Sequence, residues 1–113
     1  MTIKIVEDEI SKEELTEVGK EFFEDMVKAV VDIEKEIMAV GGELHSDSAD
    51  LLIENGSKIE NLWGINIHFN KPKEECIEYN SLINIKPSVG NRSNDIQIPE
   101  IRDKIKKIVD RLT

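Results

Sequence analysis

Three titratable side chains that follow a pair of glycines are the first candidates for chemistry in this sequence. Glu43, His45 and Asp47 stand at alternate positions after Gly41-Gly42. Alternate residues of a β-strand point to the same face, so an extended chain would place these side chains together. Two carboxylates and an imidazole suit a general base with an orienting acid. The pattern indicates catalysis of a hydrolase type, with these three residues as its candidates.

The same residues are weaker candidates for a metal site. His45 and Asp47 are types of side chain that bind metal ions. Alternate Cα atoms of a strand lie about 7 Å apart, so further ligands would have to come from His68, Asp32 or Asn66. The simpler interpretation is that His45 is a surface or interface histidine bonded to a neighbouring acid. We therefore predict no metal, and the sequence indicates no particular cofactor.

A loop near the C-terminus and one strand face offer candidate ligand-binding residues. Arg92 lies between Asn91 and Ser93, and its guanidinium with nearby backbone amides could hold a carboxylate or phosphate. The alternative is a turn in which the Asn and Ser side chains bond to the chain itself. Lys28 and Asp32 share one face of a predicted strand, where an ion pair is the simpler interpretation and ligand binding the other.

The first elements needed to position these residues are a short strand and a helix. Alternation predicts a strand over 3–6. Ser11 is placed as an N-cap with Glu14 completing a capping box, and apolar residues from Leu15 to Met26 recur at helical spacing. A helix of about 14 residues is expected. Gly19 inside it indicates a close approach to another element.

Residues 27–40 fit two patterns. One helix of about 30 residues would continue the helical spacing, whereas the alternation and the many β-branched residues favour strands. We predict a strand over 27–34, a tight turn over 34–36 and a return strand from Ile37. Gly41-Gly42 would form a bend or bulge in the return strand.

Residues 46–55 are also ambiguous between strand and helix. A helix from Ser46 to Gly56 is disfavoured because Ser and Asp side chains compete for backbone hydrogen bonds. An apolar run followed by Asn55-Gly56 is typical of a β-hairpin. Strands are then predicted over 62–69, with Trp63 as a core anchor, and over 76–85. A final helix opens at Pro99.

Together these elements predict one α+β domain over residues 1–113. The expected sheet is a mainly antiparallel meander of four or five strands. Two helices, one in the N-terminal region and one at the C-terminus, pack on one of its faces.

Charge and cysteine content narrow the classes of partner and the compartment expected for this protein. The net charge is −9, with 17 acids and 6 bases in residues 1–60 but 7 acids and 9 bases in residues 61–113. Such a field repels phosphate backbones and disfavours nucleic acid as a partner. The single Cys76 fits a reducing cytoplasm, and no apolar stretch is long enough for a membrane span. Exposed sheet edges favour a homodimer.

Several short motifs resemble a small prokaryotic family classed as a domain of unknown function. They are Gly-Gly-Glu-Leu-His-Ser-Asp at 41–47, Leu-Trp-Gly-Ile-Asn at 62–66, Ile-Asn-Ile-Lys-Pro at 83–87 and Gly-Asn-Arg-Ser at 90–93. Glu36 and Lys86 stand where that family's pattern has Gly and Arg. The resemblance implies a shared fold and assigns no catalytic residue.

Three classes of function follow from the sequence alone. The first is a small cytoplasmic binding or regulatory module that forms homo-oligomers. The alternative is a hydrolase-like enzyme or an anion-binding protein that uses Glu43, His45 and Asp47 with Arg92. A third class is a purely structural protein whose acidic half meets a basic surface on a partner. The candidate small-molecule ligand is an anion.

Overall fold

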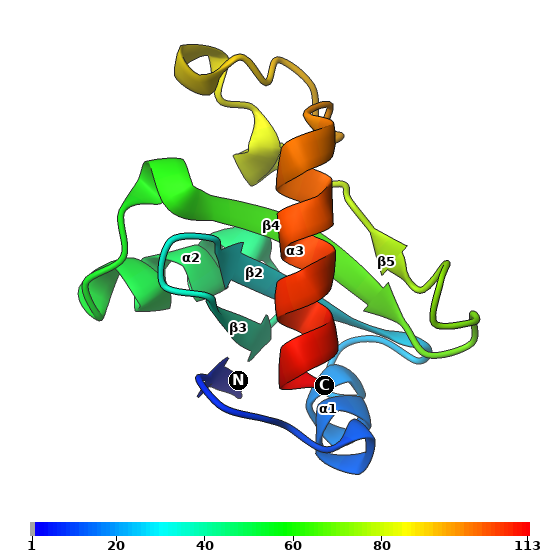
Figure 1. Ribbon diagram of the computed structural model, residues 1–113. Coiled ribbons are helices and arrows are strands. Elements are labelled where there is room, and N and C mark those ends of the chain that lie inside the picture. The colour runs from blue at the N-terminus through cyan, green and yellow to red at the C-terminus, as the bar shows by residue number, and fades with distance from the viewer. Residues whose placement is uncertain (1) are drawn as a thin grey trace.

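The computed structural model describes residues 2–113, in which a five-stranded open sheet carries helices on both faces (Figure 1). The strands are β1 (Ile3–Val6), β2 (Met26–Asp32), β3 (Ile37–Gly41), β4 (Leu62–His68) and β5 (Ile77–Glu78). The helices are α1 (Lys12–Gly19), α2 (His45–Glu54) and α3 (Pro99–Leu112), with short 3-10 turns at η1 (Ile59–Asn61), η2 (Leu82–Asn84) and η3 (Pro87–Val89). The predicted α+β class is confirmed.

The sheet is antiparallel throughout, but it is not the predicted meander. Its strand order is β1-β3-β2-β4-β5. Because β3 and β4 both run antiparallel to β2, they are parallel to each other and lie on either side of it. Parallel strands need a crossover connection, which α2 supplies.

Two crossovers explain why both faces of the sheet are covered. The connection from β1 through α1 to β2 crosses β3. The connection from β3 through α2 to β4 crosses β2 and moves in the same direction across the sheet, but it starts from β3, which runs opposite to β1. Crossovers share a right-handed sense, so the two helices belong on opposite faces. Leu15 of α1 packs in one core with the apolar stripe of α3, as predicted. Ala49 and Leu52 of α2 pack in a second core on the other face.

Helix α1 begins as predicted and ends earlier. The Ser11 hydroxyl accepts a hydrogen bond from the Glu14 amide at 3.1 Å. The helix stops at Gly19 instead of continuing to Met26, because Met26 is already paired with His68 in the sheet. A Cβ on Gly19 would lie 2.7 Å from the Met26 carbonyl oxygen, which confirms the expected close approach.

The hairpin between β2 and β3 is confirmed. Asp32 closes its turn by accepting hydrogen bonds from the amides of Glu34 and Lys35 at 2.9 and 3.0 Å. Glu36 has a φ of +59°, a conformation that favours glycine. This agrees with the glycine expected there from the family resemblance.

The predicted strand over 43–47 and the hairpin at Asn55-Gly56 are wrong, because residues 45–54 form helix α2. Gly41 and Gly42, with φ of +106° and +81°, turn the chain out of β3 and into the helix. Helical spacing buries Ser48 and Leu52 against the sheet, and the Ser48 hydroxyl donates to the Gly41 carbonyl at 3.1 Å. Burial and this hydrogen bond override the local preference of Ser and Asp for turns.

The Asn-Gly pair ends α2 instead of joining two strands. Gly56 has a φ of +100°. Its amide bonds to the Ile53 carbonyl and the Ser57 amide bonds to the Leu52 carbonyl. This is the Schellman pattern of a helix C-terminus, which uses the same left-handed residue that a tight hairpin needs.

The predicted strand over 76–85 is mostly absent, since β5 covers only Ile77–Glu78. Beyond it, the Asn84 side-chain amide pairs with the backbone of Gly64. Its oxygen accepts from the Gly64 amide at 2.8 Å and its nitrogen donates to the Gly64 carbonyl at 3.0 Å. One side chain therefore replaces a strand along this part of β4. Helix α3 begins at Pro99 as predicted.

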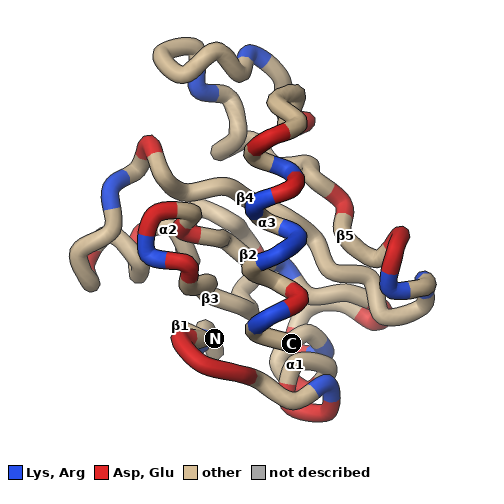
Figure 2. The backbone as a smooth tube through the Cα atoms, viewed as in Figure 1, with Lys and Arg blue, Asp and Glu red and all other residues tan. Residues whose placement is uncertain are grey.

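Charged residues are unevenly distributed over the described residues. Figure 2 shows acidic residues gathered between β1 and α1, at the opposite end of the molecule from the loop formed by residues 79–98. That loop is rich in Asn and Ser and carries few charges. No helix in the described part of the chain has the length and apolar character to cross a membrane.

Candidate functional site

A concavity lined mostly by polar residues lies beside the start of α2 and has a volume of about 310 Å³. Residues of β2, α2, β4 and the loop at 80–94 surround it. They are Lys28, Leu44, His45, Ser46, Asn66, Asn80, Ser81, Leu82, Ile83 and Asn94. We call this cavity the His45 pocket. It unites segments from four parts of the chain, including three of the motifs found in the sequence.

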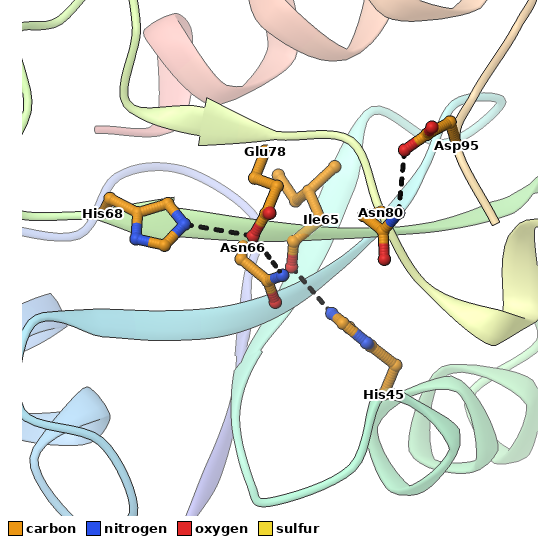
Figure 3. A network of polar contacts seen from close by, with 7 residues as sticks. All are labelled: His45, Ile65, Asn66, His68, Glu78, Asn80 and Asp95. Carbon is orange, nitrogen blue, oxygen red and sulfur yellow. Dashed lines mark hydrogen bonds and ion pairs between the residues drawn. The ribbon is translucent and has the colours of Figure 1, made fainter.

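His45 is the first residue of α2 and reaches across to β4 (Figure 3). Its Nε2 lies 2.7 Å from the Ile65 carbonyl oxygen. A carbonyl only accepts hydrogen bonds, so Nε2 carries the proton and Nδ1 is the unprotonated nitrogen. Burial lowers the pKa of His45, and the nearby Lys28 ammonium adds to this, against the opposing effects of the Ile65 carbonyl and the Asn66 side chain. The imidazole is therefore neutral at pH 7.

Asn66 belongs to a polar network on β4 and β5. Its Nδ2 donates to Glu78 Oε1 at 2.9 Å, and His68 Nε2 lies 3.1 Å from the same oxygen. The hydrogen bond from Asn66, followed by that from His68, lowers the pKa of Glu78. The hydrogen bond to Glu78 fixes the Asn66 amide so that its Oδ1 lies on the side of His45 (Figure 3). Oδ1 is buried near the His45 side chain and makes no hydrogen bond of good geometry among the described residues.

Lys28 supplies the positive charge of the pocket. Its Nζ lies 5.5 Å from the centre of the Phe23 ring, and it enters no ion pair within residues 2–113. The predicted pair with Asp32 is wrong. Asp32 Oδ1 already accepts the turn amides, and its Oδ2 accepts from the Ser57 hydroxyl at 2.6 Å. Its carboxylate therefore stabilises the β2–β3 turn and ties the end of α2 to it.

The loop that contains Arg92 is a turn whose side chains bond to the chain itself, which was the alternative interpretation of the sequence. The Asn91 Nδ2 donates to the carbonyls of Asn84, Ser93 and Asp95. Its Oδ1 accepts from the Gln97 amide at 2.7 Å. Asn91 is fully buried, whereas Arg92 is exposed and does not line the His45 pocket.

The structure does not bring Glu43 and Asp47 together with His45 into one chemical site. Glu43 is exposed in the turn before α2, and Asp47 is half-buried in its first turn. Within the described residues no hydrogen bond or ion pair joins either carboxylate to His45. Residues two apart on a helix do not face each other, which is why the expected strand-face cluster fails. No group of three His, Cys, Asp or Glu side chains that could hold a metal gathers in residues 2–113.

The sequence pattern linked His45 with Asn66 only as possible metal ligands and did not connect Lys28 to them. It did not identify the pocket wall formed by Ser46, Asn80 and Asn94. A usable signal was the concentration of Asn and Ser residues over 80–94, which interrupts an otherwise apolar strand pattern. The Asn84 side chain takes the place of strand hydrogen bonds to Gly64, and Asn80, Ser81 and Asn94 from the same segment line the cavity.

The fold and the His45 pocket define a small α+β domain with a polar cavity beside the start of α2. The chain belongs to the family described as "Protein of unknown function (DUF5674)", whose profile matches residues 4–112. This confirms the resemblance to a domain of unknown function. No significant match was found among curated proteins or among solved structures.

Proposed function

We propose that this domain is a binding module that holds a small anionic ligand in the His45 pocket. The observation that carries the proposal is Lys28, a half-buried cation that lines the cavity without an ion-pair partner in the described chain. A ligand carboxylate or phosphate would supply the missing counter-charge.

The start of α2 favours the same kind of ligand. Leu44 occupies the N-cap position and provides no side-chain hydrogen bond to the first turn. Uncapped amides at a helix N-terminus carry partial positive charge and bind anions. Ser46 and Leu44 both line the pocket, so this end of the helix adjoins the cavity that contains Lys28.

Two acceptors indicate what else the ligand carries. His45 Nδ1 has a lone pair in the neutral imidazole, and the buried Asn66 Oδ1 receives no hydrogen bond of good geometry from the described residues. An unsatisfied buried acceptor costs about 1–3 kcal/mol, which a ligand N–H or O–H would recover. The proposed ligand is therefore a small molecule with one anionic group and one hydrogen-bond donor.

This proposal is tested by titrating the protein with acetate and with inorganic phosphate while the NMR signals of the His45 ring are monitored. We expect saturable shifts in the wild type and their loss in Lys28→Met. Lys71→Met is the matched control, because Lys71 is an exposed lysine outside the pocket. Equal responses of the two variants, or no saturable shift in the wild type, would contradict binding at Lys28.

We also propose that the chain works in the cytoplasm as a homodimer. The lone Cys76 suits a reducing compartment. Strand β1 is an outer strand of the sheet and pairs there with β3 alone, and such edges favour pairing with another chain. Sedimentation equilibrium should give twice the mass of one chain. A single-chain mass at high protein concentration would count against the dimer.

A further inference from the structure

Lys86 is a second buried cation, far along the chain from Lys28. Its side chain is only 8% exposed. The ammonium donates to the Ile59 carbonyl at 2.9 Å and lies 5.4 Å from the centre of the Trp63 ring. An ammonium has three protons to donate, and the described residues provide one hydrogen-bond acceptor and no ion pair for it. Burial lowers the pKa of Lys86, only partly opposed by Glu60.

Lys86 also lines a largely apolar cavity. Its volume is about 680 Å³, and its lining residues are Ile59, Glu60, Ile83, Ile85, Lys86, Pro87 and Ser88. We call it the Lys86 pocket. Ile59 and Ile85 are 51% and 44% exposed, although isoleucine is among the residue types most often buried. The cavity thus combines apolar walls with one cation that is more than nine-tenths buried.

We propose that the Lys86 pocket is a second binding site, for a small monocarboxylate with an apolar body. The carboxylate would pair with the Lys86 ammonium, and the body would cover Ile59 and Ile85. A buried charge is costly unless it is paired and hydrogen-bonded. A carboxylate supplies both the charge and the acceptors, while the apolar walls select against small, strongly hydrated anions.

This site is distinct from the His45 pocket and does not rest on the function proposed for it. Ile83 of η2 lines both cavities and forms the wall between them. Lys28 and Lys86 each line only one of the two cavities. Variants of the two lysines therefore separate the two proposals.

Hexanoate is the probe for this proposal, and the fluorescence of Trp63 is the readout. Trp63 is the only tryptophan in the chain and lies against Lys86. Hexanoate should give a saturable change in emission, while hexan-1-ol, which has the same tail without the charge, should bind at least about ten-fold more weakly. Lys86→Met should weaken hexanoate binding by a similar factor, and Lys28→Met should leave it unchanged.

A second pair of variants keeps the test decisive if Lys86→Met does not fold. Ile85→Glu places a like charge on the wall of the pocket and should abolish hexanoate binding. Ile53→Glu is the matched control, because Ile53 is an equally exposed isoleucine outside the pocket. Equal binding of hexanoate and hexan-1-ol, no saturable response, or wild-type affinity in Ile85→Glu would each overturn the proposal.

Discussion

The two faces of the sheet differ in what they bury. Under α1 and α3 the clustered side chains are apolar, and they include Trp63 of β4 and Ile105 of α3. Under α2 a smaller apolar cluster lies among buried polar residues such as Asp32, His45 and Asn66. The comparison teaches that one face supplies most of the hydrophobic stabilisation. The other uses hydrogen bonds to hold a concavity open.

Each face depends on a different kind of anchor. On the α1 and α3 face the anchor is a large side chain, and its removal leaves a cavity. On the α2 face the anchors are amides that bond to the backbone, and their removal leaves unpaired groups. Four substitutions probe this contrast, ordered here from the largest expected effect to the smallest.

Trp63→Ala should have the largest effect. Trp63 is 1% exposed, and truncating a buried tryptophan costs about 3–5 kcal/mol through lost burial and the cavity left behind. Urea denaturation followed by far-UV circular dichroism measures this loss. A cost below about 1 kcal/mol would show that the apolar face is not the main source of stability.

Asn84→Ala should be the most damaging change among the amides that shape the pocket. Asn84 bonds to the Gly64 amide, the Gly64 carbonyl and the Asn94 carbonyl. Leaving such buried groups unpaired should lower the free energy of unfolding by about 2–3 kcal/mol. Asn94→Ala is the control, because the Asn94 side chain is exposed. Equal effects of the two substitutions would refute the anchoring role of Asn84.

Gly56→Ala tests how α2 is seated over the polar face. Its φ of +100° strains any residue with a Cβ, so a loss of about 1 kcal/mol is expected. Thermal unfolding should show the loss, whereas Glu54→Ala, an exposed change in the same helix, should stay near the wild type. A wild-type melting temperature in Gly56→Ala would mean that α2 does not need this C-terminal turn.

His45→Gln should have the smallest effect, seen only at acid pH. Burial lowers the pKa of His45 from 6.5, so below that pH the unfolded chain takes up the proton first. The wild type should therefore lose stability as the pH falls from 6.5 towards the lowered pKa of the folded protein. His45→Gln should lose less over the same range in denaturant titrations. Identical pH profiles would show that His45 does not titrate in this way.

Local signals in the sequence determined much of the fold. Ser11 and Glu14 fixed the start of α1, alternation identified β2, β3 and β4, and Pro99 marked the start of α3. The apolar stripes of α1 and α3 also predicted the shared core on one face. These features depend on neighbours in the chain, so composition and spacing are sufficient to predict them.

Tertiary structure alone decided the α2 face and, with it, the pocket. Residues 45–54 carry weak helical signals, and Asn55-Gly56 suits a hairpin turn as well as a helix end, so only burial of Ser48, Ala49 and Leu52 on the sheet selects the helix. Likewise, the Asn84 amide takes the place of a strand only because Gly64 lies opposite it. The sequence pattern related Asn66 to His45 only as a possible metal ligand and did not connect Lys28 to either residue. The crossover through α2 brings them together, because residues far apart in sequence meet only once strand order and helix face are set.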